Sequence, residues 1–206
     1  MDAQDWDTRY EQTDLMWSQG PNQWVEEVTA GLPPGRALDL AAGEGRNAIW
    51  LAGRGWQATA VDFSAVALDR ATRIAAERLG ADAARFSTQQ EDLLTFTPEP
   101  RSYDLVLVVY LQVVADERSR VLRAAADAVA PGGTLVVTAH DSDNIERGYG
   151  GPPDPAVLYS AADVASDIDG SGLTVDRAQQ VRRAVTTADG PREALDCLVV
   201  ATRPRG

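Results

Sequence analysis

Two acidic side chains and two closely spaced glycines form the part of the sequence best suited to chemistry. Asp39 ends a short apolar run, and a turn containing Gly43 and Gly45 leads into a second apolar segment that starts at Ala48. Glycine lacks the Cβ that keeps a ligand from the backbone, and a helix start offers unpaired N–H groups. Asp62 ends another apolar run, where its carboxylate is able to accept hydrogen bonds from both hydroxyls of a ribose. The pattern predicts a nucleotide site.

The kind of nucleotide is harder to infer from the sequence, because Gly43-x-Gly45-x-x-Ala48 also satisfies the dinucleotide fingerprint. In that fingerprint a pyrophosphate sits at the helix N-terminus. Asp39 and Glu44 place two carboxylates beside the turn, and they would oppose a pyrophosphate while suiting a ligand with an ammonium and a sulfonium. An NAD(P)-dependent oxidoreductase and a non-catalytic nucleotide-binding regulator are the alternatives.

These residues resemble the first motif of the class I S-adenosylmethionine-dependent methyltransferases, commonly a strand acid followed by Gly-x-Gly-x-Gly. Ala41 stands in the place of the first glycine. The resemblance implies methyl transfer from the cofactor S-adenosylmethionine to a small-molecule acceptor. It also implies that an acid after the third strand, matched by Asp92, accepts the adenine amino group, while its neighbour Leu93 offers backbone to the ring. The expected cofactor-binding residues are Asp39, Ala41, Gly43, Gly45, Asp62, Phe63, Asp92, Leu93 and Val109.

The first 30 residues are polar but rich in large aromatics. The segment WDTRYEQTDLMW is similar to the N-terminal region of tellurite-resistance and thiopurine methyltransferases, where it covers the bound cofactor. Trp17, Trp24, Val25 and Val28 also have roughly helical spacing, which favours a helix packed on the sheet. We expect residues 1–35 to form a helical lid in which Tyr10 and Trp17 face the ligands, and both interpretations can hold together.

The remaining chain alternates apolar strands with helices, as in a doubly wound, mostly parallel seven-stranded sheet of Rossmann-like type. Strands are expected over 37–40, 58–61, 84–88, 103–114, 134–138, 173–185 and 195–202. Helices are expected over 48–52, 64–79, 116–129 and from 160 to about 170. The run YDLVLVVYLQVV is apolar throughout, which predicts a central strand buried on both faces. Residues 36–206 are therefore expected to form the core of a single domain spanning 1–206.

His140, the only histidine, is expected just after the fifth strand, where a base within reach of an acceptor hydroxyl would stand. A lone loop histidine that meets solvent is the simpler interpretation. Asp141, Asp143 and Asn144 raise the possibility of a magnesium site, but no carboxylate follows the fourth strand before Asp116. We therefore predict no metal.

The amino-acid composition limits the classes of molecule that the protein is expected to bind. The chain has 206 residues, 31 acidic and 19 basic, for a net charge of −12, which argues against binding a nucleic-acid backbone and favours a small acceptor. All basic residues are arginines, so lysine-dependent phosphate loops and Schiff bases are excluded. The acidic N-terminus is no secretory signal, and no apolar run reaches the ~20 residues that span a bilayer. A cytoplasmic protein is expected; the acceptor, its methylated atom and the oligomeric state are not specified.

Overall fold

The computed structural model describes residues 20–206, and its centre is a seven-stranded sheet in the order β3-β2-β1-β4-β5-β7-β6. Strands β1 to β5 are mutually parallel, while β7 runs antiparallel to both of its neighbours. The predicted doubly wound, mostly parallel sheet is therefore confirmed. The strands are β1 (Arg36–Leu40), β2 (Gln57–Asp62), β3 (Phe86–Gln90), β4 (Tyr103–Val109), β5 (Val129–His140), β6 (Thr174–Thr187) and β7 (Gly190–Thr202).

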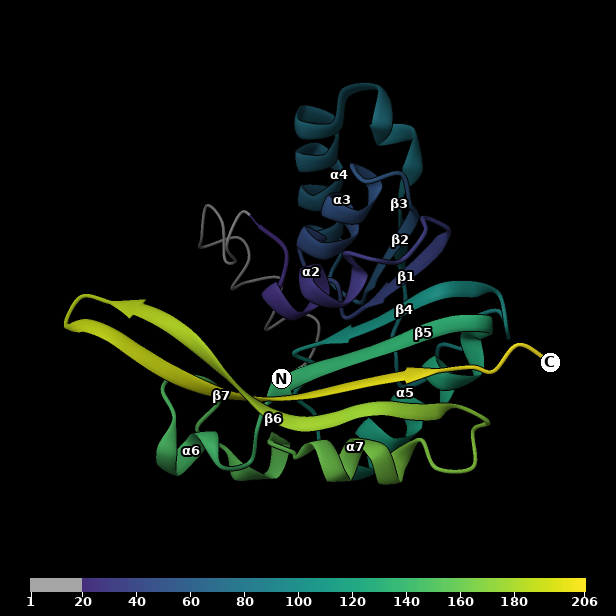
Figure 1. Ribbon diagram of the computed structural model, residues 1–206. Coiled ribbons are helices and arrows are strands. Elements are labelled where there is room, and N and C mark those ends of the chain that lie inside the picture. Colours follow the sequence, from purple (N-terminus) through teal and green to yellow (C-terminus); the bar gives the residue numbers. More distant parts are fainter. Residues whose placement is uncertain (1–19) are drawn as a thin grey trace.

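Helices cover the two faces of this sheet. The helices α3 and α4 pack beside β1 and β2, and α5 and α7 lie on the opposite side beside β4 to β7 (Figure 1). Ser64 begins α4 as predicted, because its side chain accepts a hydrogen bond from the Ala67 N–H. The helices are α2 (Gln23–Thr29), α3 (Arg46–Ala52), α4 (Ala65–Leu79), α5 (Ala115–Ala128), α6 (Asn144–Arg147) and α7 (Ala161–Asp167), with 3₁₀ turns at Gly80–Arg85 and Pro155–Val157.

Strand β4 lies at the centre of the packing. Its neighbours are β1 and β5, and its side chains alternate between two apolar clusters on opposite faces. Val106 and Val108 join the cluster beneath α5 and α7, while Leu105 and Leu107 join the cluster beneath α3. All four are fully buried, which explains why the whole run is apolar instead of alternating with polar residues.

Several predicted boundaries were wrong. The fourth strand ends at Val109 and not at residue 114, because Tyr110 adopts a φ of 58° that a strand does not allow. The third strand covers 86–90 instead of 84–88, since a 3₁₀ turn takes Ala84 and Arg85. The fifth begins at Val129, directly after α5, and includes Pro131 and its glycines with a register shift opposite β4.

The C-terminal elements also differ in length from the prediction. Helix α7 ends at Asp167, a few residues before the expected end near residue 170, and it starts with a capping box formed by Ser160 and Asp163. Strands β6 and β7 continue past the end of β5 into a hairpin arm that projects from the sheet (Figure 1). Pairing reaches Thr187 and Gly190 at its tip, so the loop that we expected there is mostly strand.

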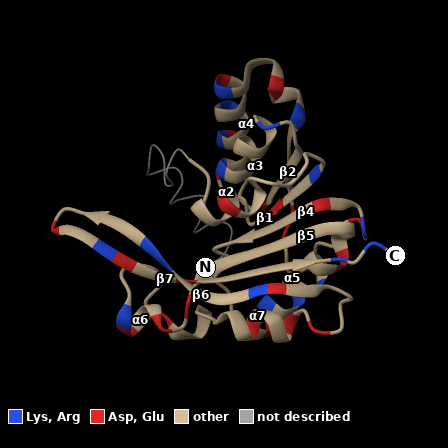
Figure 2. Cartoon of the chain, in the orientation of Figure 1, with Lys and Arg blue, Asp and Glu red and all other residues tan. Residues whose placement is uncertain are grey.

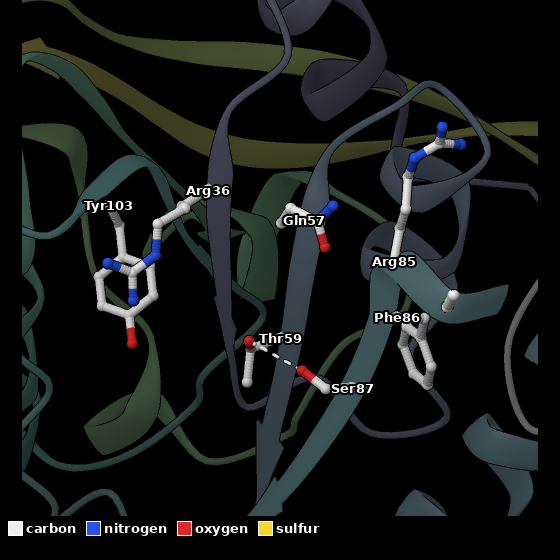
Figure 3. Close-up of a pocket in the computed structure, with 8 residues that line it drawn as sticks. Arg36, Gln57, Thr59, Arg85, Phe86, Ser87 and Tyr103 are labelled. Atoms are coloured by element: carbon white, nitrogen blue, oxygen red, sulfur yellow. Dashed lines mark hydrogen bonds between the residues drawn. The ribbon is translucent and has the colours of Figure 1, made fainter. Parts of the chain in front are cut away.

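A shallow cavity of about 270 Å³ lies at the amino ends of the parallel strands. Arg36, Gln57, Phe86 and Tyr103, which line it, are the first residues of β1, β2, β3 and β4 (Figure 3). Residues 91–102, between β3 and β4, form turns and no helix, which leaves this part of the sheet face open. The cavity is thus at the opposite sheet edge from the glycine turn, which follows the carboxyl end of β1.

Two further expectations concern the ends of the chain and membranes. Tyr10, Trp17 and most of the predicted lid fall outside the described residues, so the lid stays a prediction. Within residues 20–206, no helix combines the length and apolar character needed to cross a bilayer. The single cysteine, Cys197, is fully buried in β7.

Candidate active site

The turn after β1 has three residues in the left-handed backbone region. Their φ angles are 58° at Ala41, 54° at Gly43 and 73° at Gly45. Ala41, which replaces a glycine of the motif, adopts that region despite its Cβ. A Cβ at Gly45 would lie 3.0 Å from the Cβ of Ala71 in α4, so this glycine serves the close packing of α4 on the turn. Our expectation that both glycines clear space for a ligand does not hold for Gly45.

Asp62 at the end of β2 holds this turn in place. Its Oδ2 accepts a hydrogen bond from the Gly43 N–H at 2.8 Å, and its Oδ1 accepts one from the Ser64 N–H at 3.0 Å. The side chain is almost fully buried, with 6% of its surface exposed. The predicted ribose contact of Asp62 stays a prediction beside this structural role.

Asp39 carries the strongest signal for a missing ligand. Both of its carboxylate oxygens are buried, and neither accepts a hydrogen bond of ordinary geometry from residues 20–206, although the Ala48 N–H and the Asn47 side chain are close enough to lower its pKa. Burial raises the pKa of Asp39 to about 7, although the Ala48 backbone and the Arg46 guanidinium act to lower it. A buried acceptor without a partner costs about 1–3 kcal/mol, so the site favours a ligand that brings a donor or a positive charge.

The charges around the turn differ from those expected. Glu44 is buried and its Oε1 lies 3.1 Å from Nη1 of Arg70 in α4, so its negative charge is offset. Arg46, the first residue of α3, adds positive charge near Asp39. The electrostatic argument against a pyrophosphate therefore depends on Asp39 alone.

The other predicted cofactor residues lie along the carboxyl ends of neighbouring strands. Phe63 is half-buried directly after β2, and its carbonyl accepts a hydrogen bond from the Gln90 amide at the end of β3. Asp92 is exposed two residues later, with Oδ1 accepting from the Leu94 N–H, and Leu93 is half-buried. Val109, at the end of β4, is 6% exposed, so it belongs chiefly to the core.

A second cluster of polar side chains lies at the ends of β4 and β5. The sequence did not predict that these side chains come together. Asp196 of β7 is fully buried, and its Oδ2 accepts hydrogen bonds from the Tyr110 hydroxyl at 2.8 Å and from Nε of Arg183 at 2.8 Å. Its Oδ1 lies 3.5 Å from Nδ1 of His140, and Trp24 of α2 donates its indole N–H to Oδ2 at 3.5 Å. We call Tyr110, His140, Arg183 and Asp196 the acceptor-side cluster.

Sequence reasoning missed Asp196 although one signal was present. It is a single carboxylate within the apolar run LDCLVVA, and acids are seldom buried unless they are paired. His140 is the last residue of β5 and not a loop residue after it. The residue is more enclosed than a lone loop histidine would be, because its ring packs against Tyr110 with centroids 4.9 Å apart and its Nδ1 lies 3.5 Å from Oδ1 of Asp196.

The acceptor-side cluster adjoins the glycine turn through Arg46. The guanidinium carbon of Arg46 lies 6.0 Å from the centre of the Tyr110 ring, and that of Arg183 lies 5.6 Å from it. The loop after β4 is held by Gln112, whose Oε1 accepts from the His140 N–H and whose Nε2 donates to the Val157 carbonyl. The turn and the cluster therefore share one edge of the sheet.

The oxygen-rich segment after β5 has structural partners. Asp141 Oδ1 accepts hydrogen bonds from the Asp143 N–H and from the Gln180 side chain. Asn144 Oδ1 accepts from the Leu195 N–H, and Arg147 pairs with Asp143. Over residues 20–206, no three potential ligands among His, Cys, Asp and Glu come together as a metal would require.

These residues fit the charge of S-adenosylmethionine. Its ammonium would supply donors to Asp39. The turn at Ala41 to Gly45 follows the carboxyl end of β1, the end at which open parallel sheets bind their ligands. Asp62, Asp92 and Leu93 follow the next two strands, where the ribose and adenine were expected. The residues present thus fit the cofactor that the sequence implied.

Comparison with known proteins agrees with this fit. Residues 37–133 match the family model described as a methyltransferase domain. This stretch of the chain is therefore similar to a methyltransferase domain. The match runs from β1 into β5 and so includes the glycine turn, Asp62 and the end of β4.

Individual relatives resemble larger parts of the chain. The tRNA 5-carboxymethoxyuridine methyltransferase of Escherichia coli (strain K12) is 33% identical over 127 residues, which cover 60% of this chain and 48% of that protein. The chain therefore spans about half the length of this curated relative. A glycopeptide N-methyltransferase complexed with S-adenosylmethionine has a TM-score of 0.67 at 20% identity, covering 92% of this chain and 96% of the other. A [4+2]-cyclase has a TM-score of 0.67 at 18% identity, covering 89% and 80%.

The matched domain and the methyltransferase neighbours support S-adenosylmethionine as cofactor and an S-adenosylmethionine-dependent methyltransferase as enzyme class. The likeness to solved structures shows the fold, which hosts more than one chemistry, as the cyclase illustrates. The acceptor must therefore be argued from this chain's own residues.

Proposed function

We propose that this chain transfers a methyl group from S-adenosylmethionine to a small-molecule acceptor. The observation that carries the proposal is Asp39, a buried carboxylate that accepts no hydrogen bond of ordinary geometry from the described residues, at the turn of the stretch that matches a methyltransferase domain. The acceptor-side cluster lies along the same sheet edge, where an acceptor would meet the cofactor.

The roles of the binding residues follow from their positions. Asp39 offers its charge to an ammonium, while Asp62 holds the Gly43 N–H and keeps the turn in shape. When bound, the cofactor supplies an electrophilic methyl group on a sulfonium. Tyr110 and its neighbours would position the acceptor, and positioning accounts for much of the rate in a displacement between two bound molecules.

A small acceptor is favoured over a nucleic acid by the distribution of charge. Figure 2 shows acidic and basic segments interspersed over α4 and the β6–β7 arm and only acidic ones on α7, with no continuous run of basic residues in this view. Three arginines near the site, Arg46, Arg70 and Arg183, face Asp39, Glu44 and Asp196 within the protein. They are thus partly compensated and less available to phosphates.

Isothermal titration calorimetry with S-adenosylhomocysteine, S-adenosylmethionine, NAD and NADP tests the cofactor. We expect both adenosyl ligands to bind and both dinucleotides to fail. Asp39→Asn should weaken binding about 10-fold or more, since a charge-assisted contact contributes about 1.5–3 kcal/mol. Asp189→Asn, in the exposed turn of the β6–β7 arm, is the matched control and should bind normally.

Transfer of labelled methyl groups into a cell extract tests the activity. Label in the low-molecular-mass fraction is the expected result. Binding of S-adenosylhomocysteine without any transfer would support the non-catalytic regulator, and binding of NAD alone would support the oxidoreductase. Placement in the tellurite-resistance and thiopurine branch, and the lid at residues 1–35, stay predictions from the N-terminal sequence.

A further inference from the structure

Asp196 brings together four separate parts of the chain. The carboxylate is on β7, yet its contacts come from Tyr110 after β4, His140 on β5, Arg183 on β6 and Trp24 on α2. A fully buried carboxylate with this many partners is costly to assemble for packing alone. Its place beside the methyltransferase turn suggests a role in chemistry.

The ring of His140 is held on several sides. Tyr110 packs against it at 4.9 Å between centroids, and a Cβ at Gly151 would come within 2.9 Å of it, so only glycine fits there. The backbone N–H of His140 donates to Gln112. Its Nδ1 is buried and makes no hydrogen bond within the described chain, but lies 3.5 Å from Oδ1 of Asp196. Catalytic hydrogen bonds are often long before ligands bind.

We propose that His140 is the general base of the methyl transfer, that Asp196 positions it through Nδ1–H, and that the acceptor is therefore a hydroxyl compound. This inference rests on the proposed function. Nδ1–H donation to Asp196 leaves Nε2 as the nitrogen that accepts the acceptor's proton.

The surrounding charges suit a base that is neutral at rest. Burial lowers the pKa of His140 from its ordinary value; Asp196 acts to raise this pKa and Arg183 acts to lower it. Arg183 and Tyr110 both donate to Asp196, which limits how strongly that carboxylate attracts a proton to the imidazole. Arg46 is the remaining charged group close to Tyr110.

The step balances in atoms and charge. The S–CH₃ bond breaks as an O–CH₃ bond forms, the hydroxyl proton passes to Nε2 of His140, and S-adenosylhomocysteine leaves without the sulfonium charge. The positive charge ends on the imidazolium, where Asp196 stabilises it. A hydroxyl requires this help because even a phenol has a pKa of about 10, whereas a thiol at about 8.5 ionises more readily without a base.

The tautomer of His140 tests the proposal directly, because the chain contains a single histidine. Neutral histidine in water prefers the Nε2–H tautomer. We expect ¹⁵N-detected imidazole spectra of the wild-type protein at pH 8, with S-adenosylhomocysteine bound, to show Nδ1–H. Asp196→Asn should move the population toward Nε2–H and lower the histidine pKa further. Glu193→Gln, on the same strand but exposed and paired with Arg182, should change neither.

If His140 of the wild-type protein is in the Nε2–H form, the proposal is wrong. This result does not depend on the variants, so the test remains decisive even if Asp196→Asn folds poorly. Calorimetry with S-adenosylhomocysteine separates this failure from that of the proposed function. If the ligand binds and the tautomer is Nε2–H, the base assignment alone is wrong. If the ligand does not bind, the proposed cofactor is wrong. In that case the tautomer of His140 is measured without added ligand. Nδ1–H then supports the proposed hydrogen bond from His140 to Asp196, and Nε2–H overturns it.

Discussion

At the scale of single residues, the site depends on how two buried carboxylates are satisfied. Asp62 gives its lone pairs to two backbone N–H groups and thereby shapes the turn. Asp39 accepts no hydrogen bond of ordinary geometry from the described chain, and burial raises its pKa to about 7. The sequence placed both acids at strand ends but could not separate their roles, because this depends on which backbone N–H groups the turn points at each of them.

The raised pKa of Asp39 predicts that cofactor affinity depends on pH. A cationic ligand prefers the ionised carboxylate, and the ionised fraction falls as the pH drops below about 7. We expect S-adenosylhomocysteine to bind about tenfold more weakly at pH 6 than at pH 8. Calorimetry in buffers of different ionisation enthalpy should also show proton release on binding near pH 7.

Two variants identify the titrating group in this experiment. Asp39→Asn should bind weakly with little change between pH 6 and pH 8, whereas His140→Gln should keep the wild-type dependence. A dependence that persists in Asp39→Asn would place the titration elsewhere.

At the scale of elements, the glycine turn combines strain with tight packing. Ala41 and Gly45 both have positive φ angles, and a Cβ added at Gly45 would lie 3.0 Å from the Cβ of Ala71. Left-handed backbone costs a residue with a Cβ about 1–2 kcal/mol, so Ala41 stores part of this strain in the native turn. Both positions are glycines in the sequence motif, but in the structure they differ in backbone strain and packing.

The two positions should respond to substitution with opposite signs. Ala41→Gly relieves strain but adds freedom to the unfolded chain, for a net gain in unfolding free energy of up to ~1 kcal/mol. Gly45→Ala adds both strain and the contact with Ala71, for a loss of about 2–4 kcal/mol. Urea denaturation measures both, and a gain in Gly45→Ala would contradict the packing role.

Element boundaries show where sequence patterns stop being informative. The apolar run through residue 114 predicted a longer fourth strand, but apolar side chains say nothing about the φ of 58° at Tyr110 that ends it. The core of each strand was predictable because burial on both faces demands apolar residues. Strand ends depend instead on single backbone angles and on turn contacts, such as the bond from the Tyr110 N–H to the Thr138 carbonyl.

At the scale of the whole molecule, the sheet order brings the acceptor-side cluster together. β7 lies between β5 and β6, which places Asp196 next to residues from strands far away in the sequence. Tyr110 and Asp196 are 86 positions apart. The cofactor half of the site lies within local motifs and was therefore predicted from sequence, whereas the acceptor half depends on long-range pairing and was not.

The overall charge leads to the last prediction, which concerns nucleic acid. One relative is a tRNA methyltransferase, yet this chain has 31 acidic and 19 basic residues and no lysine. Nucleic-acid affinity comes mainly from basic side chains that displace counterions, and non-specific binders typically reach dissociation constants of about 10⁻⁴–10⁻⁶ M. We expect fluorescence anisotropy with labelled total tRNA to give a dissociation constant weaker than about 10⁻⁴ M at 150 mM salt. The Escherichia coli relative, measured alongside, is the reference for a protein that acts on tRNA. Micromolar binding that weakens steeply with salt, together with labelled methyl groups in the tRNA fraction, would contradict the small-molecule proposal and make tRNA the acceptor.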